Sequence, residues 1–281
     1  MTELTVLVDG IEMGESPRWH DGRLWFCDWL AHEVRAVDLD GRVEVMAHVD
    51  ALPFSIDWLA DGTLVVVAGT RVLRREPDGT LVPHADLSPV ASDPWNEIVV
   101  DGEDRIWVNN VGFDFGGGAE PEPGLVAVVT PDGRVRRVAD DLWFPNGMAV
   151  TADGSTLVVA ESHGHCLTAF DIGDDSTLTD RRTWADLGPD AAPDGICIDA
   201  DGAVWWAEVP GMRCVRTAEG GATLQTIAAD RGCFACMLGG ADGRTLFVVA
   251  NAWGGVEDGA SAGVVYVAEA PAPAAGWPAS R

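Results

Sequence analysis

Basic residues are scarce in this 281-residue chain. Lysine and arginine together number 18, against 45 aspartate and glutamate residues, and the formal net charge is −27. Proteins that bind nucleic acids need clustered basic residues to contact phosphates, so this composition argues against a nucleic-acid partner. Many of the acidic residues lie in turns, and their combined field should draw cations toward any cavity lined by carboxylates.

Long apolar runs are also missing. No stretch approaches 18 consecutive apolar residues, so no membrane span is expected. The first ten residues lack the basic region and apolar run of a secretory signal, and we expect a cytoplasmic protein. Nothing in the sequence points to an obligate protein partner, which leaves a small-molecule substrate as the expected ligand.

The six cysteines include one close pair, Cys233 and Cys236, with no second pair and no βαβ pattern beside it. A single C-x-x-C is weak evidence for zinc or redox chemistry. We expect six reduced thiols that act as small apolar core residues.

Helical patterns are absent too, since no window of 12 or more residues carries a clean 3.6-residue apolar period. Short β-branched runs predominate, and six Asp-Gly turns each lead into one, at intervals of 40 to 52 residues, beginning at Asp21, Asp61, Asp101, Asp153, Asp201 and Asp242. This period predicts an all-β fold, a six-bladed β-propeller with four-stranded antiparallel blades around a central channel.

One propeller domain is expected over residues 1–270. Exposed strand edges favour closure of the ring, so we expect residues 4–8 to pair with residues 264–267. Residues 271–281, rich in alanine and proline, are predicted to form an unpacked tail.

Four of the six repeats carry an oxygen-bearing side chain five to seven residues before the Asp-Gly turn: Glu15, Asn96, Asn146 and Asp194. In a propeller these positions begin the innermost strands and should meet in the channel. Two carboxylates and two amide carbonyls suit one hard divalent cation, with calcium first and magnesium or manganese as alternatives. Zinc remains a further alternative. Taken singly, each residue would more often be an ordinary turn or surface residue, and it is the shared phase of all four that favours a metal site.

These residues stand in motifs that resemble a known family, the senescence-marker-protein, gluconolactonase and luciferin-regenerating-enzyme group. The motifs are Gly14-Glu15-Ser16-Pro17, Pro145-Asn146-Gly147 and Pro193-Asp194-Gly195, and the resemblance covers roughly residues 10 to 268. It implies a cation held by Glu15, Asn146 and Asp194, with Asn96 close by as a ligand or substrate contact. The four-residue pattern is also similar to that of the diisopropyl-fluorophosphatases.

The sequence departs from this family at one position. Sugar-lactone hydrolases of the group carry an arginine two residues before the channel asparagine and an acid after it, where this chain has Pro94 and Glu97, with Trp95 between. An apolar substrate is therefore expected. Aromatic residues assigned to loops at the channel mouth are Trp29, Phe54, Trp95, Phe113, Phe115, Trp143, Phe144 and Trp253, whereas Trp25, Trp107, Trp205 and Trp206 are expected in the core.

A metal-dependent lactonase or esterase is the first functional hypothesis, with Asp194 activating a water or attacking the substrate directly. Glu97, Asn96, Trp95, Phe54, Phe113, Trp143 and His163 are the expected substrate contacts, and a structural role for His163 stays open. No G-x-S-x-G motif supports a serine triad. The alternatives are phosphotriester hydrolysis, a lyase or isomerase on the same site, and a non-enzymatic calcium-binding or interaction propeller.

Overall fold

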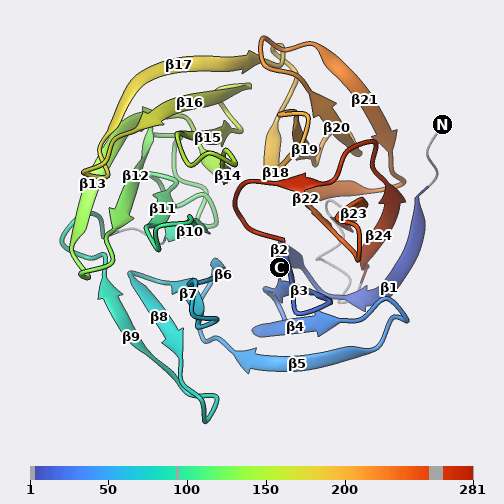
Figure 1. Cartoon of the computed structure of the whole chain (residues 1–281), viewed down its shortest axis with the longest axis horizontal. Helices are drawn as coiled ribbons and strands as arrows, with labels where there is room; N and C mark the ends of the chain where they lie inside the picture. Colours follow the sequence, from blue (N-terminus) through green and yellow to red (C-terminus); the bar gives the residue numbers. More distant parts are fainter. Residues whose placement is uncertain (1–3, 93–94, 253–261, 281) are drawn as a thin grey trace.

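The computed structural model describes residues 4–92, 95–252 and 262–280, and in these ranges every regular element is a β-strand. Six sheets stand around a central axis like the blades of a propeller (Figure 1). The all-β six-bladed prediction is confirmed. There is accordingly no helix in the described ranges that could cross a membrane.

Each of the first five blades is a four-stranded antiparallel meander that runs outward from the axis. Blade 1 contains β2 (Gly14–His20), β3 (Arg23–Asp28), β4 (Glu33–Val37) and β5 (Val43–His48), and blade 2 contains β6 (Phe54–Trp58), β7 (Leu64–Ala68), β8 (Arg71–Arg75) and β9 (Leu81–Asp86). Blade 3 contains β10 (Trp95–Val100), β11 (Ile106–Asn110), β12 (Gly124–Val129) and β13 (Val135–Leu142). Blade 4 contains β14 (Pro145–Val150), β15 (Thr156–Glu161), β16 (Cys166–Ile172) and β17 (Leu178–Asp186), and blade 5 contains β18 (Pro193–Asp199), β19 (Val204–Glu208), β20 (Arg213–Thr217) and β21 (Thr223–Ala228).

Blade 6 closes the ring with strands from both ends of the chain. It combines β22 (Gly232–Gly239), β23 (Thr245–Asn251) and β24 (Gly263–Glu269) with the N-terminal β1 (Thr5–Ile11) as its outermost strand. Thr5 pairs with Val267 and Asp9 with Val264, so the predicted closure is confirmed. An edge that would otherwise be open is thereby paired.

The Asp-Gly turns join the first and second strands of every blade, as the repeat predicted. In blade 2 the Asp61 carboxylate accepts a hydrogen bond from the backbone N–H of Thr63 at 2.9 Å. Gly62 has φ of +84°, a conformation that disfavours residues with a Cβ. All six turns therefore lie at the ends of the inner strands and define one face of the propeller.

The core lies between neighbouring blades rather than at the centre. Val65 and Val67 of blade 2 pack with Ile98 and Ile106 of blade 3, and equivalent clusters fill the other interfaces. Inner strands are buried along almost their whole length, whereas outer strands such as β5 are largely exposed. Trp25, Trp107, Trp205 and Trp206 are buried, as predicted.

Five of the six cysteines lie in the core as predicted, and Cys166 is only half-buried. All six are free thiols. Burial raises the pKa of Cys27, Cys197, Cys214 and Cys236, which disfavours the reactive thiolate at neutral pH.

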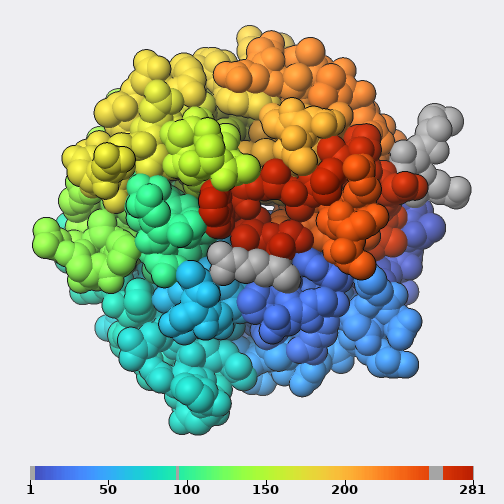
Figure 2. Space-filling view, viewed as in Figure 1, coloured from blue at the N-terminus to red at the C-terminus, as the bar shows by residue number. Residues whose placement is uncertain are grey.

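The expectation of an unpacked C-terminal tail is wrong. After β24 the chain crosses the face that carries the Asp-Gly turns, where Figure 2 shows it in red over the centre. Strand β25 (Ala274–Ala275) adds to β18, and Trp277 exchanges backbone hydrogen bonds of 2.8 and 2.9 Å with Val150 at the end of β14. The Ala/Pro-rich composition of the tail did not predict these contacts, because β18 and Val150, to which the tail binds, lie far from it in the sequence.

This tail, residues 271–280, touches four blades in succession. Pro271 accepts a hydrogen bond from Arg244 of blade 6, and Pro273 accepts one from Ala200 of blade 5 at 2.8 Å. Trp277 then bridges to blade 4 and lies against Gly102 of blade 3, where a Cβ would come within 2.5 Å of the indole. The tail therefore ties the inner ends of four blades together on one face.

Candidate metal centre and substrate cavity

The four residues predicted as metal ligands come together at the opposite face. Glu15, Asn96, Asn146 and Asp194 are each the second residue of an inner strand, in β2, β10, β14 and β18 respectively. All four line one cavity of about 390 Å³. Residues at similar distances before the Asp-Gly turns therefore lie together in one cavity of the folded chain.

A shift in strand register at each predicted ligand position orients these side chains. In blades 1, 3, 4 and 5 the register between the first and second strands shifts at the ligand position, for example between Glu15 and Arg18 and between Trp95 and Ile98. Such bulges interrupt the alternation of side chains and redirect them. Blade 2, which contributes no predicted ligand, pairs regularly from Phe54 to Trp58.

The amide side chains are held by a chain of hydrogen bonds. Asn96 Nδ2 donates to Asn146 Oδ1, and Asn146 Nδ2 donates to Ser162 Oγ, both at 3.4 Å. Ser162 in turn donates to the carbonyl of Pro193 at 2.7 Å. Asn109 fixes the strands themselves, because its Nδ2 donates to the Asn146 carbonyl at 2.6 Å while its Oδ1 accepts from the Glu97 N–H at 3.1 Å.

Two buried carboxyl groups, Glu15 and Asp194, line this site. Glu15 is 6% exposed and Asp194 9% exposed. Burial raises the pKa of Glu15 well above its usual range, and the charges of Asp194 and Glu97 raise it further. Burial also raises the pKa of Asp194, and the charge of Glu97 raises it further, whereas a hydrogen bond from Asn146 lowers it. Without a compensating positive charge, these carboxyl groups would favour the protonated state.

Asp194 also carries an oxygen without a partner. Its Oδ1 is buried and accepts no hydrogen bond from the described residues. Buried oxygens of this kind are rare in folded proteins, and a cation is one way to satisfy them. The residues therefore fit a divalent cation bound by Glu15, Asn146 and Asp194.

The donor set narrows the choice of metal. Nowhere in the described ranges do three or more His, Cys, Asp or Glu side chains gather as a metal cluster, and the four predicted ligands offer only carboxylate and amide oxygens. Zinc prefers nitrogen and sulfur ligands, whereas calcium, magnesium and manganese accept oxygen alone. Zinc is therefore the weakest of the four candidates.

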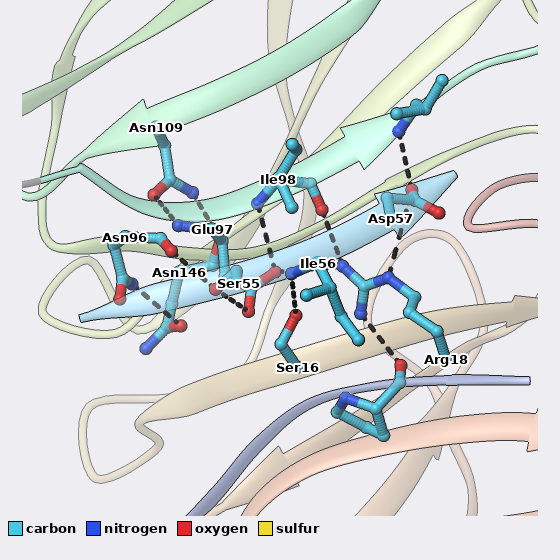
Figure 3. A network of polar contacts seen from close by, with 12 residues as sticks. Ser16, Arg18, Ser55, Ile56, Asp57, Asn96, Glu97, Ile98, Asn109 and Asn146 are labelled. Carbon is cyan, nitrogen blue, oxygen red and sulfur yellow. Dashed lines mark hydrogen bonds and ion pairs between the residues drawn. The ribbon is translucent and has the colours of Figure 1, made fainter. Parts of the chain in front are cut away.

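Glu97 lies next to this site and is anchored by a buried polar network (Figure 3). Its Oε2 accepts from Arg18 Nη2 at 3.2 Å, and its Oε1 accepts from the Ser55 hydroxyl at 3.1 Å. Ser55 also donates to the carbonyl of Asn96 at 2.6 Å. A third carboxylate of the cavity is thus held in one position by residues of blades 1 and 2.

Arg18 connects this network to a further acid. Its guanidinium also donates to the carbonyls of Ile98 at 2.6 Å and Pro17 at 2.9 Å, and its Nε lies 4.0 Å from Asp57. Burial raises the pKa of Asp57 to about 6, although Arg18 and two backbone N–H groups act in the opposite direction. The absence of an arginine before Asn96 was evident in the sequence, whereas the contact of Arg18 with Glu97 was not expected; Arg18 is 5% exposed and acts on the cavity through Glu97.

Apolar side chains form the rest of the cavity wall: Met13, Trp29, Phe115, Phe144, Ala192, Val209, Pro210 and Phe234. The predicted apolar pocket is therefore present, but its members differ in part from those expected. Phe54 and Trp95 have no exposed surface, so neither can touch a substrate in this structure. Trp143 is 45% exposed and lies outside the wall.

Phe113 and His163 belong to an aromatic group at the cavity mouth. His163 lines the cavity and packs on Phe144 with ring centres 4.8 Å apart, and Phe113 lies behind them, 5.9 Å from His163. Burial lowers the pKa of His163, and no ion pair joins it to a carboxylate within the described ranges. These contacts favour the structural role. Pro94 and Trp253 lie outside the described residues.

Comparison with known proteins agrees with this geometry. The family model of the SMP-30/gluconolactonase/LRE-like region matches residues 13–252. The chain belongs to this family. The matched range includes all four predicted ligands and leaves out the N-terminal strand and the tail.

Among relatives in the SMP-30/gluconolactonase family, regucalcin of Gallus gallus is 27% identical over 252 residues, which cover 85% of this chain and 83% of that protein. A gluconolactonase from Xanthomonas campestris superposes with a TM-score of 0.77 at 25% identity, over 96% of this chain and 90% of the other. A calcium-binding regucalcin from Agrobacterium tumefaciens superposes with a TM-score of 0.79 at 21% identity, over 96% of both chains.

Proposed function

We propose that this protein is a divalent-metal-dependent hydrolase of a lactone or related ester with an apolar body. The observation that supports this most directly is the placement of Glu15, Asn146 and Asp194, with its unpartnered Oδ1, at the floor of an apolar-walled cavity. Family membership with gluconolactonases supports the same reaction class. The oxygen donors and the calcium-binding regucalcin relative favour calcium as the metal.

In this proposal Glu15, Asn146 and Asp194 bind the cation, which when present polarises the substrate carbonyl as a Lewis acid. Asn96 orients the substrate beside them, while Phe115 and Phe144 hold its apolar body and exclude water. Asp194 either accepts a proton from the attacking water or attacks the carbonyl carbon itself. In the first route water oxygen bonds to the carbonyl carbon, the ring C–O bond breaks, and the proton passes to the leaving alkoxide to give a hydroxy acid. In the second route the ring C–O bond breaks as Asp194 bonds to the carbonyl carbon, the leaving alkoxide takes a proton from solvent, and water hydrolyses the resulting anhydride to release the hydroxy acid and the Asp194 carboxylate.

Two measurements test the proposal. Calorimetric titration with calcium should show weaker binding to Glu15→Gln and Asp194→Asn than to the parent, since each substitution removes a charged oxygen ligand. Asp153→Asn makes the same chemical change in an exposed turn on the far face and should bind as the parent does. Equal affinity in all four proteins would place the metal elsewhere.

The reaction class is tested by a pH-stat screen of the calcium-loaded protein. The panel contains gluconolactone, aryl and alkyl lactones, simple esters and a fluorophosphate. We expect acid release from a lactone or ester that stops when the metal is chelated. A fluorophosphate as the only substrate would establish the phosphotriester alternative, and the absence of any turnover would leave the lyase or isomerase and the non-enzymatic alternatives.

A further inference from the structure

A second cavity opens on the opposite face of the propeller, between blades 1 and 2. It has a volume of about 620 Å³ and lies where β2 and β6 end, at His20 and Trp58. Both strands begin at the central site and run away from it, so the two cavities lie at opposite ends of the same strands. We call this second cavity the blade 1–2 cleft.

An aromatic group forms one side of the cleft. His20 stacks on Trp58 with ring centres 4.3 Å apart, and Trp25 meets Trp58 edge-on at 5.1 Å. Leu59, Leu64 and Pro77 add apolar surface beside them. Because these rings pack against one another, this side of the cleft is already formed without a ligand. Ligand-binding sites are usually preformed in this way.

A cation without a counter-ion forms the other side. Arg75 lines the cleft, its Nε has no hydrogen-bond partner, and no carboxylate pairs with it in the described part of the chain. Its neighbour Arg74 is by contrast paired with Glu76 at 2.9 Å. In a chain with a formal charge of −27, an arginine left unpaired inside a cavity calls for an anionic partner.

The acidic residues around the cleft already contact other residues, and their negative charge limits the charge of the ligand that the cleft can bind. Asp21 lies 3.6 Å from His20 Nε2, Glu76 is bound to Arg74, and Asp61 caps its own turn through Thr63. Three carboxylates at the rim repel a multiply charged anion such as a phosphate ester, while a single negative charge can reach Arg75. The volume exceeds what a small inorganic ion would fill.

We infer that the blade 1–2 cleft binds a monocarboxylate with an aromatic body, its carboxylate on Arg75 and its ring against Trp25 and Trp58. This inference does not depend on the proposed hydrolase activity. It concerns a different cavity at the other end of the inner strands.

Calorimetric titration with 1-naphthylacetate, with calcium chelated throughout, tests the inference. Under this condition the central cavity holds no cation that could attract the carboxylate of the probe. We expect binding to the parent, and binding weaker by about tenfold or more in Arg75→Gln, which loses a charge-assisted pair. Arg71→Gln is the matched control, since Arg71 is exposed at the other end of β8 and does not line the cleft. It should bind within about twofold of the parent, well inside one such pair.

A second comparison needs no variant. The neutral 1-naphthylacetamide has nearly the same shape and should bind the parent at least about tenfold more weakly, because it lacks the charge. The inference is overturned if the parent fails to bind naphthylacetate at millimolar concentration, if the amide binds equally well, or if Arg75→Gln binds as the parent does. Affinity that rises on adding calcium would place the ligand in the central cavity and overturn it too.

Discussion

Replacing Arg18 by methionine should destabilise the protein, and more at high pH than at low pH. Arg18 is 5% exposed and is the ion-pair partner of Glu97 and Asp57, which are 5% and 4% exposed. Methionine fills much of the same volume but leaves two buried carboxylates without a cation. Removing one partner of a buried ion pair typically costs about 3–5 kcal/mol. For a chain of this size that corresponds to a fall in melting temperature of roughly 6–20 °C.

The pH dependence follows from Asp57. Its folded pKa of about 6 lies above the usual value of 3.8, so the folded state binds more protons than the unfolded state between these pH values. This group therefore lowers stability as pH rises from about 4 to 6, by an amount on the order of 3 kcal/mol. Arg18 opposes the shift, so its loss raises the pKa of Asp57 further. At pH 5 Asp57 is largely protonated in both proteins, and the difference between them should be smaller than at pH 8.

Urea unfolding at pH 5 and pH 8, followed by tryptophan fluorescence, measures both effects. Arg42→Met is the control, because Arg42 is largely exposed and its pairs with Asp38 and Asp40 lie in solvent. We expect it to change the free energy of unfolding by less than about 0.5 kcal/mol. An Arg18→Met protein as stable as the control, or one that loses equally at both pH values, would refute the reasoning.

Three further predictions concern the site and the tail. Asp194→Asn should lower turnover at saturating calcium by about 100-fold or more, and Asp153→Asn should leave it unchanged, as steady-state kinetics on the best substrate will show. An apolar lactone should be preferred to gluconolactone by at least about tenfold in kcat/KM, because buried hydroxyls without partners cost roughly 1–3 kcal/mol each. If gluconolactone is the best substrate, this prediction is wrong. Truncation after Ala270 removes the tail contacts to four blades and should lower the melting temperature measured by calorimetry. The expected fall is roughly 2–4 °C for each kcal/mol of unfolding free energy lost. An unchanged melting temperature would mean that the tail adds nothing to stability.

The sequence was sufficient for the fold because its signals are local. Each Asp-Gly turn is fixed by a few neighbouring residues, so the repeat marks the inner hairpin of every blade. The predicted ligand positions followed from their similar distance, five to seven residues, to those turns. Ser55 stands six residues before Asp61, in the same phase as Glu15 before Asp21, and this signal could have placed it on an inner strand beside the predicted ligands, where it donates to the Asn96 carbonyl.

The errors lie where side-chain direction depends on strand register. Phe54 and Trp95 each precede a channel residue by one position, and alternation along the strand turns them away from the cavity. Glu97 follows Asn96 directly and still lines the cavity, because the register shift in β10 interrupts that alternation. Arg18 was overlooked since its partners lie 79 and 80 residues away, in blade 3.

Closure of the ring by β1 has a consequence for how the chain is made. Thr5 and its partner Val267 are 262 residues apart, and at about 5–20 residues per second a ribosome needs roughly 13 to 52 s between them. Strand β1 is therefore unpaired until β24 emerges, and the edge of β24 is unpaired until β1 reaches it. Pairing over such a separation is slow, and strands that wait can associate with those of other molecules. Yield of folded protein should thus improve when expression is reduced, since fewer incomplete chains are then present at the same time to meet one another.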